Sequence, residues 1–552
     1  MRSIGRTNGV SPRTSVAIAI QIPLGQRFSE KNGTGGLCDA DVKGVAAHDG
    51  QPMQRADSVS TTTLEALPPL GSQADSVNTN DVSTFETPLR SYALLDMSDA
   101  ALAKGRAHLQ TVADNADTGA TLDAIAERLF DSGLERVRVG IDGQDLVVEY
   151  ENHRYNQNEA DALGIVLGVA SDMAPQSIER IHAVIKKANE PLADVAVDRA
   201  AYVTFLHGGS PSAASSSLTM STGAGHAADA IAWHGDATRH GLTRIQISPV
   251  TSYLYGTDCG NFDISLGVSI QGFVPLWRGA EFYATYIAPI YNTKNMDDGR
   301  VYSQYRLRGG LSDVALAQSF WIVPRVFNVV SVGKMDFSYI GVQNETTAFV
   351  PGRPDLIRLR LAYLHREPGH EALPNEKNAT LTYRWVQPAW KLWVEAGVAH
   401  YVGGDQGPLI TFTRWFDDVS VSVHGEHSGK GSFVGASVSF PLTPRQGMKP
   451  GFTQISGPEQ FALDFRTRVG SRNYLAGNEA ENLALPYSTQ QYLLNQGRFS
   501  AQYFGTQLYR MRDSYLRYVP ARESPAKLPP TARSRTVAGC IDRSGESLCK
   551  RT

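Results

Sequence analysis

The sequence predicts a mainly β protein, in which a small α+β module precedes an antiparallel β-barrel of the transmembrane type. Two observations support this fold class: short runs of alternating apolar and polar residues, and tryptophans at the ends of several runs. We expect about twelve strands over residues 242–442, because transmembrane barrels carry this weak, repeated alternation in each strand. A large soluble antiparallel β protein also alternates, so a soluble sandwich or barrel is the competing interpretation.

The clearest alternation lies in residues 261–277, NFDISLGVSIQGFVPLW, where every second position from Phe262 to Ile270 is apolar. Successive side chains of a strand point to opposite faces, so this strand has one apolar and one polar face. Similar patterns predict strands at residues 301–308, 337 onward, 357–363, 381–385, 390–396 and 419–426. With the apolar face in lipid, the lipid-facing band should contain Phe262, Ile264, Leu266, Leu359 and Leu361.

The tryptophans are concentrated in the same region. All seven lie between residues 233 and 415. Membrane barrels place aromatic girdles at the ends of their strands, where the rings meet the lipid headgroups. We therefore predict an aromatic girdle made of Trp277, Trp321, Trp385, Trp390, Trp393 and Trp415.

Arginines occupy polar positions of three of these runs. If the apolar face meets lipid, the arginines line a wet lumen, whereas in a small soluble barrel they would point outward to water. Two roles are open for them: pairing with lumenal Asp and Glu to hold the barrel shape, or forming a cationic lining that favours an anionic polymer. The predicted lumen residues are Arg306, Arg308, Arg358, Arg360 and Arg384.

The amino-terminal residues 1–27 are interpreted as the remnant of an upstream barrel. The segment SVAIAIQIPLGQR (residues 15–27) can be laid on FVGASVSFPLTPR (residues 433–445), since both alternate, reach Pro-Leu and then a basic residue. We expect residues 15–24 to be the last strand of a barrel whose other strands are not in this chain, with chance similarity as the alternative. The same stretch shows no usable export signal, because Gln and Pro interrupt it and no small-residue cleavage site follows.

The compact α+β module is predicted for residues 98–206. Apolar spacing from Leu122 to Phe130 indicates an amphipathic helix, and Asp142-Gly143 between two alternating stretches indicates a hairpin. The further elements expected are a helix at residues 158–173, strands at 178–185 and 192–197, and a helix at 198–206.

Three other segments are expected to be largely irregular. Residues 28–97 are rich in Ser, Thr, Asp and Gly and poor in aromatics, so they predict a polar linker. Residues 207–241, rich in Gly, Ser and Ala, predict a second linker. Residues 443–552 are expected to form a mixed helical region followed by a disordered tail.

Composition excludes two classes of function. The chain has 552 residues, with 52 basic and 55 acidic side chains and a net charge of -3, which argues against a nucleic-acid-binding protein. No apolar run is long enough to cross a bilayer as a helix, which excludes a helical membrane protein. Among the four cysteines, Cys540 and Cys549 either close a short disulfide loop or stay unpaired, and Cys38 and Cys259 have no metal-ligand spacing.

No catalytic, cofactor-binding or metal-binding residues are predicted. Residues 207–210 (HGGS) resemble an oxyanion loop, but no G-x-S-x-G elbow accompanies them. On one strand His424 and Glu426 share a face while His427 points the other way, so a shared metal is not expected. Glu395 and Glu426 could face one lumen, but glycoside cleavage needs two carboxylates fixed a few ångströms apart, and the sequence does not place them together.

Five stretches carry a family resemblance. Together they resemble the YjbH-like family of exopolysaccharide-associated outer-membrane proteins, and the segment holding Arg498, Arg510, Met511 and Arg512 is the most specific part. The stretches are QGFVPLWRG (271–279), FVGASVSFPLTPRQGMKP (433–450), LERVRVGIDGQDLVVEYENHRY (134–155), EADALGIVLG (159–168) and NQGRFSAQYFGTQLYRMRDSYLRY (495–518).

The resemblance implies an outer-membrane lipoprotein with β-barrel regions around a periplasmic α/β module, working in secretion of extracellular polysaccharide. The partners it implies are outer-membrane lipid, the polysaccharide and other polysaccharide-export proteins. We expect a non-enzymatic export component, with an outer-membrane polysaccharide-modifying enzyme or a general porin-like channel as alternatives. Two close carboxylates in a cleft would favour the enzyme, and an open, charged passage would favour export.

Overall fold

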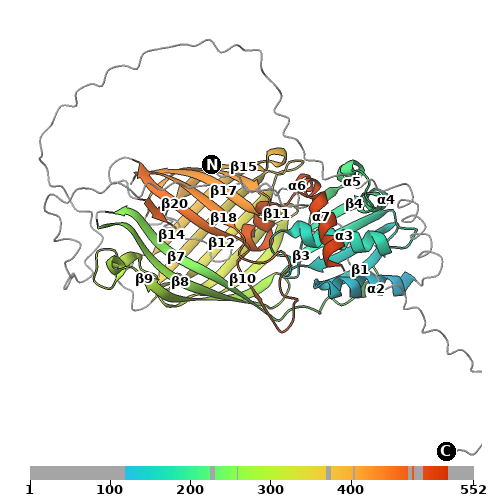
Figure 1. Ribbon diagram of the computed structural model, residues 1–552, viewed down its shortest axis with the longest axis horizontal. Coiled ribbons are helices and arrows are strands. Elements are labelled where there is room, and N and C mark those ends of the chain that lie inside the picture. Colours follow the sequence, from blue (N-terminus) through green and yellow to red (C-terminus); the bar gives the residue numbers. More distant parts are fainter. Residues whose placement is uncertain are drawn as a thin grey trace, which may run out of the picture.

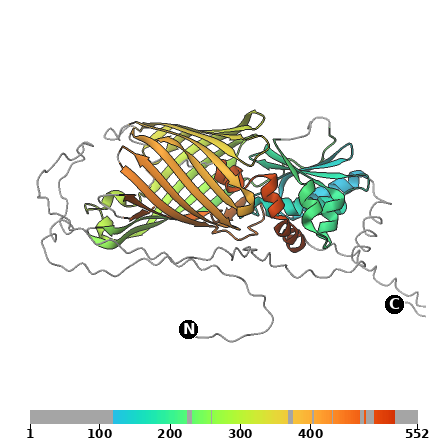
Figure 2. The same ribbon diagram turned by 90° about the horizontal axis from the view of Figure 1, so that it is seen from above.

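A computed structural model describes residues 118–519, apart from residues 224–230, 258, 368–374, 402–403, 430, 470–474 and 478–488. It contains a six-stranded sheet and a fifteen-stranded sheet. The large sheet curls into a ring, and the small sheet with its helices lies at one end of that ring (Figure 1; seen from above in Figure 2). The expected remnant strand at 1–27, the linker at 28–97, residues 98–117 of the predicted module and the tail from 520 lie outside the described residues.

The small sheet is built from two hairpins, each followed by a helix. The parallel pairing of β2 with β3 joins the two hairpins into one sheet. Each helix begins at a side-chain cap, because Asn158 Oδ1 accepts a hydrogen bond from the Ala160 amide and Asp198 Oδ1 accepts one from the Ala201 amide. The first unit comprises β1 (Glu135–Asp142), β2 (Asp145–Glu151) and α3 (Glu159–Met173), and the second β3 (Arg180–Lys187), β4 (Glu190–Asp198) and α4 (Arg199–Leu206).

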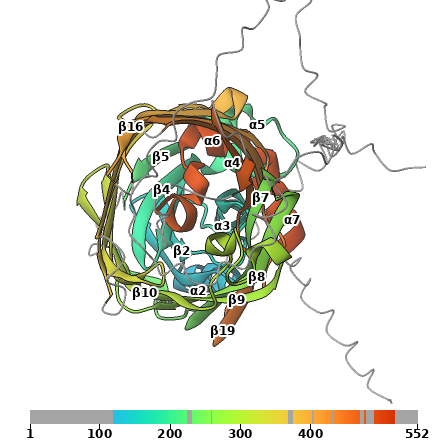
Figure 3. The same cartoon turned by 90° about the vertical axis from the view of Figure 1, so that its left-hand side faces the viewer.

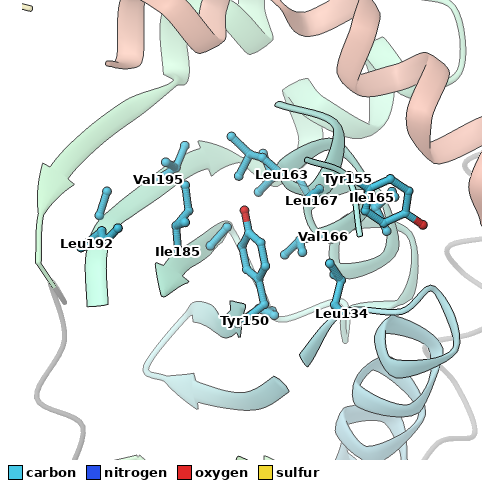
Figure 4. Close-up of a cluster of buried hydrophobic side chains, with 14 of the residues drawn as sticks. Leu134, Tyr150, Tyr155, Leu163, Ile165, Val166, Leu167, Ile185, Leu192 and Val195 are labelled. Carbon is cyan, nitrogen blue, oxygen red and sulfur yellow. The ribbon is translucent and has the colours of Figure 1, made fainter. Parts of the chain in front are cut away.

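The core of this module lies between the sheet and its helices. Tyr150 and Ile185 of the sheet face Leu163 and Val166 of α3, and all four side chains are fully buried (Figure 4). The helix α2 (Thr118–Asp131) buries its own apolar stripe, as the spacing from Leu122 to Phe130 predicted. The predicted hairpins and the helices at residues 158–173 and 198–206 are likewise confirmed.

The predicted linker at residues 207–241 is wrong where regular elements form. It contains α5 (Pro211–Ser217), β5 (Thr219–Thr222) and β6 (His234–Gly235). β5 pairs with β4 and β6 pairs with β1, so both edges of the small sheet come from this segment. Strands this short show no readable alternation, and the neighbouring strand, rather than their own sequence, determines that they form.

The large sheet joins neighbouring strands along antiparallel ladders, except that β19 runs parallel to β7. β7 pairs with β8, and also with β19 and β21. Viewed from the end far from the module, the strands form a ring (Figure 3). The strands are β7 (Thr243–Thr257), β8 (Gly260–Pro275), β9 (Ala280–Asn292), β10 (Gly310–Val323), β11 (Val326–Met335), β12 (Tyr339–Phe349), β13 (Leu356–Arg366), β14 (Glu376–Gln387), β15 (Leu392–His400), β16 (Gln406–Phe416), β17 (Val419–Ser428), β18 (Gly431–Phe440), β19 (Thr453–Ser456), β20 (Phe461–Val469) and β21 (Leu475–Gly477).

Two expectations about this sheet need correction. It does not end at residue 442, because β20 follows and pairs with β18, so the predicted helical region at 443–552 begins with strands. Residues 301–308 are not a strand but contain the 3-10 turn Ser303–Tyr305. Tyr302 and Tyr305 pack together against Leu254 and Met296, and residues three apart can share a face in a 3-10 turn but not in a strand.

Many apolar side chains of the large sheet point outward, whereas others, such as Phe273 and Phe327, are buried. On β8, Phe262 is 40% exposed while the neighbouring Asp263 is 2% exposed, and on β13 Leu361 is 41% exposed while Arg358 is 7% exposed. None of the five residues predicted for the outer band belongs to an apolar core cluster of the described residues. Within the described part of the chain, every helix is too short or too polar to span a membrane.

Candidate functional site: the sheet interior and its closed end

The interior of the large sheet holds a cluster of charged residues, here called the arginine cluster: Arg358, Arg360, Arg384, Glu345 and Glu395. Arg358 donates to Glu345 Oε1 at 3.0 Å through Nη2 and to Glu395 Oε1 at 3.0 Å through Nη1. Arg384 donates to Glu395 Oε2 at 2.7 Å through Nε. The antiparallel register aligns these strands so that Arg384 lies opposite Glu395 and Arg360 opposite Glu345.

Pairing inside the cluster is incomplete. Arg358 and Arg384 share the two glutamates, as expected of residues that hold the sheet together. Arg360 forms no hydrogen bond or ion pair with another described residue, although it faces the same interior. Three guanidinium groups against two carboxylates leave the cluster with an excess of positive charge.

The other two predicted lumen arginines lie elsewhere. Arg306 and Arg308 belong to the connection between β9 and β10 rather than to a strand, because the alternation that suggested one forms a 3-10 turn. Arg306 Nη1 pairs with the exposed Asp298 at 2.9 Å, and Arg308 Nη1 donates to Ser338 Oγ at 3.5 Å. Neither joins the arginine cluster.

The predicted aromatic girdle is half wrong. Trp277, Trp385 and Trp390 are exposed on the outside, but Trp321, Trp393 and Trp415 face inward. Trp393 and Trp415 stack with their ring centroids 5.2 Å apart, and Arg384 lies over Trp393. The parity of each position explains the difference: Trp393 is two residues from the inward Glu395, so both point to the same face.

The module is fastened to the turns at one end of the large sheet. On one side, its β3–β4 hairpin holds the β8–β9 turn, where Arg278 pairs with Glu190 at 2.6 Å and the Gly279 amide donates to Ala188 O at 2.7 Å. Trp321 Nε1 also donates to Pro191 O at 2.8 Å. The module therefore covers this end of the ring, as Figures 1 and 2 show.

On the opposite side, Asp161 of α3 is the centre of an ion network. Arg445 and Arg510 both donate to its carboxylate, at 2.7 and 2.6 Å, and Ser514 Oγ donates at 2.6 Å. Burial raises the pKa of Asp161, but the two guanidinium groups outweigh burial and hold that pKa below its ordinary value. Arg510 also reaches Asp418 in the β16–β17 turn, so the network ties module, sheet and α7 (Leu508–Tyr518) together.

Sequence reasoning singled out Arg498 and Arg510 but missed their partners. Asp161 and Arg445 were within the stretches that carry the family resemblance, so those stretches were the available signal. Glycines complete the contact of α3 with α7: a Cβ on Gly164 would meet the Met511 backbone.

A carboxyl-terminal segment, residues 489–499, crosses the interior at the end covered by the module. The Thr489 amide donates to Glu345 Oε2 of β12 at 3.0 Å, and Tyr492 Oη donates to Gln271 Oε1 of β8 at 2.9 Å, four strands further along the sheet. Arg498 Nη1 donates to Asp418 Oδ1 at 3.1 Å. Red helical turns from this part of the chain lie inside the outline of the strands in Figure 3.

A small cavity separates this segment from the module. It has room for about one water molecule and is lined by polar residues of the module, the segment and the loop before β20. Lys187 Nζ pairs with Glu159 Oε2 at 3.2 Å there, and Glu459 faces them. Burial raises the pKa of Glu459 to about 7.

The residues considered for chemistry are held in structural contacts. Glu395 accepts hydrogen bonds from two arginines and from Thr382, and Glu426 lies 4.0 Å from Arg466. His427 Nδ1 forms a hydrogen bond with Ser432 Oγ, on the strand face opposite to that of His424. In the HGGS loop, Ser210 caps α5. Among the described residues no group of His, Cys, Asp and Glu is placed to hold a metal ion.

These features define the class of this protein: a large antiparallel sheet, apolar outside and charged inside, with an α+β module over one end. A family model described as "YjbH: Exopolysaccharide biosynthesis protein YbjH" matches residues 76–351. The chain belongs to this family, which confirms the resemblance and relates the protein to exopolysaccharide biosynthesis.

Other comparisons add less. No curated protein matches the chain. Among solved structures, the low-pH structure of Pseudomonas putida OprB is 12% identical, covering 43% of this chain and 90% of that one, with a TM-score of 0.25. A mutant of the Rh. blastica porin is also 12% identical, covering 42% of this chain and 97% of that one, with a TM-score of 0.23.

Proposed function

We propose that the protein is a non-enzymatic outer-membrane component of exopolysaccharide secretion, whose large sheet closes into a membrane-spanning barrel. The observation that carries the proposal is the distribution of side chains: Phe262 and Leu361 face outward while the arginine cluster lies inside. An outward apolar surface around a charged interior is the arrangement that suits a barrel in lipid. Family membership then connects the barrel to exopolysaccharide.

The connections between strands support an orientation in the membrane. Outer-membrane barrels have short periplasmic turns and longer extracellular loops. At the module end the hairpins close through residues 324–325 and 417–418, whereas the opposite end carries the long connection 293–309. This asymmetry favours a periplasmic module. Cys259 is disulfide-bonded, which also fits an oxidising compartment outside the cytoplasm.

The interior supports a role in handling an anionic polymer. The arginine cluster carries more positive than negative groups, and Arg360 has no hydrogen-bond or ion-pair partner among the described residues. Rings of charged side chains in a pore select for ions of opposite charge. The periplasmic module would then meet other polysaccharide-export proteins, and the outward band would meet outer-membrane lipid.

Two alternatives are separated from export by their chemistry. A polysaccharide-modifying enzyme needs a proton-donating carboxyl that a sugar can reach, whereas Glu395 accepts hydrogen bonds from Arg358 and Arg384, and the raised-pKa Glu459 lines a cavity with room for about one water molecule. A general porin needs an open passage, whereas the module and residues 489–499 cover one end of the interior. The first observation argues against the enzyme, and the second argues against a permanently open porin.

Deletion of the gene, with measurement of secreted and periplasmic polysaccharide, tests the proposal. Export predicts less secreted polymer and accumulation in the periplasm, restored by the parent gene. Unchanged amounts in both fractions would contradict the export role. Longer chains at a similar yield would point to the enzyme.

A further inference from the structure

We propose that residues 489–494 form a displaceable plug in the barrel interior, that residues 495–497 are its hinge, and that Arg498 is the fixed anchor. The inference rests on the proposed barrel function, because a plug matters only if the interior is a passage. It adds that the structure is the closed state and that a polymer passes only after the plug swings out.

The plug closes the interior by touching separate parts of the wall. Thr489 is held by Glu345 on β12, and Tyr492 is held by Gln271 on β8 and packs on Phe273 with ring centroids 5.2 Å apart. Leu493 and Leu494 are 2% and 1% exposed and belong to the main apolar cluster. The segment therefore reaches from β12 to β8 across part of the interior, at the end that the module covers.

The seat of the plug leaves polar groups unsatisfied. Thr489 Oγ1, Gln343 Oε1 and Thr347 Oγ1 are buried without a hydrogen-bond partner among the described residues. Gln343 and Thr347 share the inward face of β12 with Glu345, which accepts the hydrogen bond from the Thr489 amide. A buried polar group without a partner costs free energy that water recovers when the group is exposed. The seat of the plug is therefore polar on the β12 side and apolar around Leu493 and Leu494.

The backbone supplies a hinge next to the plug. Residues 489–493 form a π-helical turn, a rare geometry often found at functional sites. Asn495, Gln496 and Gly497 then have φ values of 49°, 60° and 79°. Three consecutive residues in the left-handed region interrupt any helix, and side chains other than glycine adopt that region at a cost. The chain therefore changes direction between the plug and Arg498.

Beyond the hinge, the chain is fixed. Arg498 is 1% exposed, and it donates to Gln157 O at 2.7 Å and to Asp418 at 3.1 Å while its guanidinium lies over Trp415. The following helix α7 is held by the Asp161 network. Asn495 is fixed as well, because its Oδ1 accepts a hydrogen bond from the Glu159 amide at 3.1 Å. The part that can leave its seat while the module stays attached therefore ends at residue 494.

Planar-bilayer conductance of the full chain tests the plug. Tyr492→Phe removes the hydrogen bond to Gln271 without removing the ring, and one neutral hydrogen bond corresponds to roughly a five-fold change in the closed-to-open ratio. We expect about five-fold more open time in this variant, and more again in Leu493→Ala/Leu494→Ala. Tyr509→Phe, on an exposed tyrosine of α7, is the matched control and should behave as the parent. Equal open times in parent and plug variants would overturn the plug.

A second measurement needs no membrane. In detergent, Leu494→Cys should react with a maleimide about five-fold faster when combined with Tyr492→Phe than with Tyr509→Phe. An unchanged rate would overturn the plug whether or not the protein inserts into lipid. A rate that responds to Tyr492→Phe, in a protein that never conducts in bilayers, would support the moving segment and contradict the barrel function.

Discussion

The two sheets of this molecule use alternation in opposite ways. In the module, Val148 and Tyr150 are fully buried against α3, so the apolar face turns inward and forms a core. In the large sheet, Phe262 and Leu361 turn outward, and Arg358 and Arg384 are enclosed. The comparison teaches that a period of two defines two faces of a strand, whereas the surroundings decide which face is the inside.

The energetic consequence differs between the two regions. The module removes its apolar surface from water by folding alone, which is the dominant stabilising term for a small domain. The outward apolar side chains of the large sheet contribute the same hydrophobic stabilisation only when lipid covers them. The arginine cluster, in turn, is stable inside only because its glutamates compensate the charge.

The largest effect is expected where the two regions join. Asp161→Ala should destabilise the chain by about 3 to 5 kcal/mol, because it leaves the guanidinium groups of Arg445 and Arg510 without their shared buried anion. Urea denaturation measures the loss. Asp513→Ala is the control, since Asp513 also pairs with Arg445 but is 43% exposed and should contribute about 0 to 1 kcal/mol. Equal losses would show that the network does not hold the junction.

The second prediction tests the outward apolar face. Leu361→Lys should cost about 2 to 4 kcal/mol for folding into lipid vesicles, since a cation on the lipid face of a barrel is unfavourable near the middle of the bilayer. Leu516→Lys, on a leucine of α7 that is 60% exposed, should change stability by less than about 0.5 kcal/mol. A similarly small effect of Leu361→Lys would place water, and not lipid, against the large sheet.

Sequence reasoning identified the module elements and the outward band for one physical reason. Helical spacing and strand alternation are local, so Leu122–Phe130 and the run from Phe262 to Ile270 carried their own signal. The same reasoning failed at Arg306 and Arg308, where alternation of tyrosine and arginine matched a strand but the residues close a 3-10 turn. A short alternating run does not distinguish the two.

The closed end could not be predicted, because its parts are distant in sequence. Asp161 meets Arg445 and Arg510 only after the sheet has curled and the carboxyl-terminal helix has docked. The inward tryptophans show the same limit: Trp393 and Trp415 stand near strand ends, as girdle residues do, but their parity turns them inside. The sequence showed where along a strand each tryptophan lies. Whether its side chain points into or out of the sheet depends on the strand register, which the sequence alone did not give.

The third prediction concerns pH at the junction. Burial raises the pKa of Glu459 from 4.5 to about 7 in the folded protein. The folded state therefore prefers the protonated carboxyl, so the stability contributed is full below the unfolded pKa and is lost as pH rises toward the folded pKa. We expect the free energy of unfolding to fall by about 1 to 3 kcal/mol between about pH 5 and pH 8 from this group.

The control for this prediction compares two glutamates. Glu459→Gln should remove that part of the pH dependence, because the amide does not ionise. Glu127→Gln, on an exposed glutamate of α2, should leave the slope of the parent unchanged. Identical slopes in the parent and Glu459→Gln would show that this carboxyl does not set the pH response of the junction.

The smallest effect on stability is expected at Arg360. Here the role of charge in holding the sheet together can be separated from its role in attracting an anionic polymer. Arg360 forms no ion pair with another described residue and lies near two like charges, so Arg360→Gln should change stability by less than about 0.5 kcal/mol. It should nevertheless reduce secretion of an anionic polymer, and more at low salt than at high salt, because ions screen charges over about 10 Å at 0.1 M. Arg325→Gln, in an exposed turn, should leave secretion unchanged. Equal secretion by Arg360→Gln and parent at every ionic strength would leave the arginine cluster with its structural role alone.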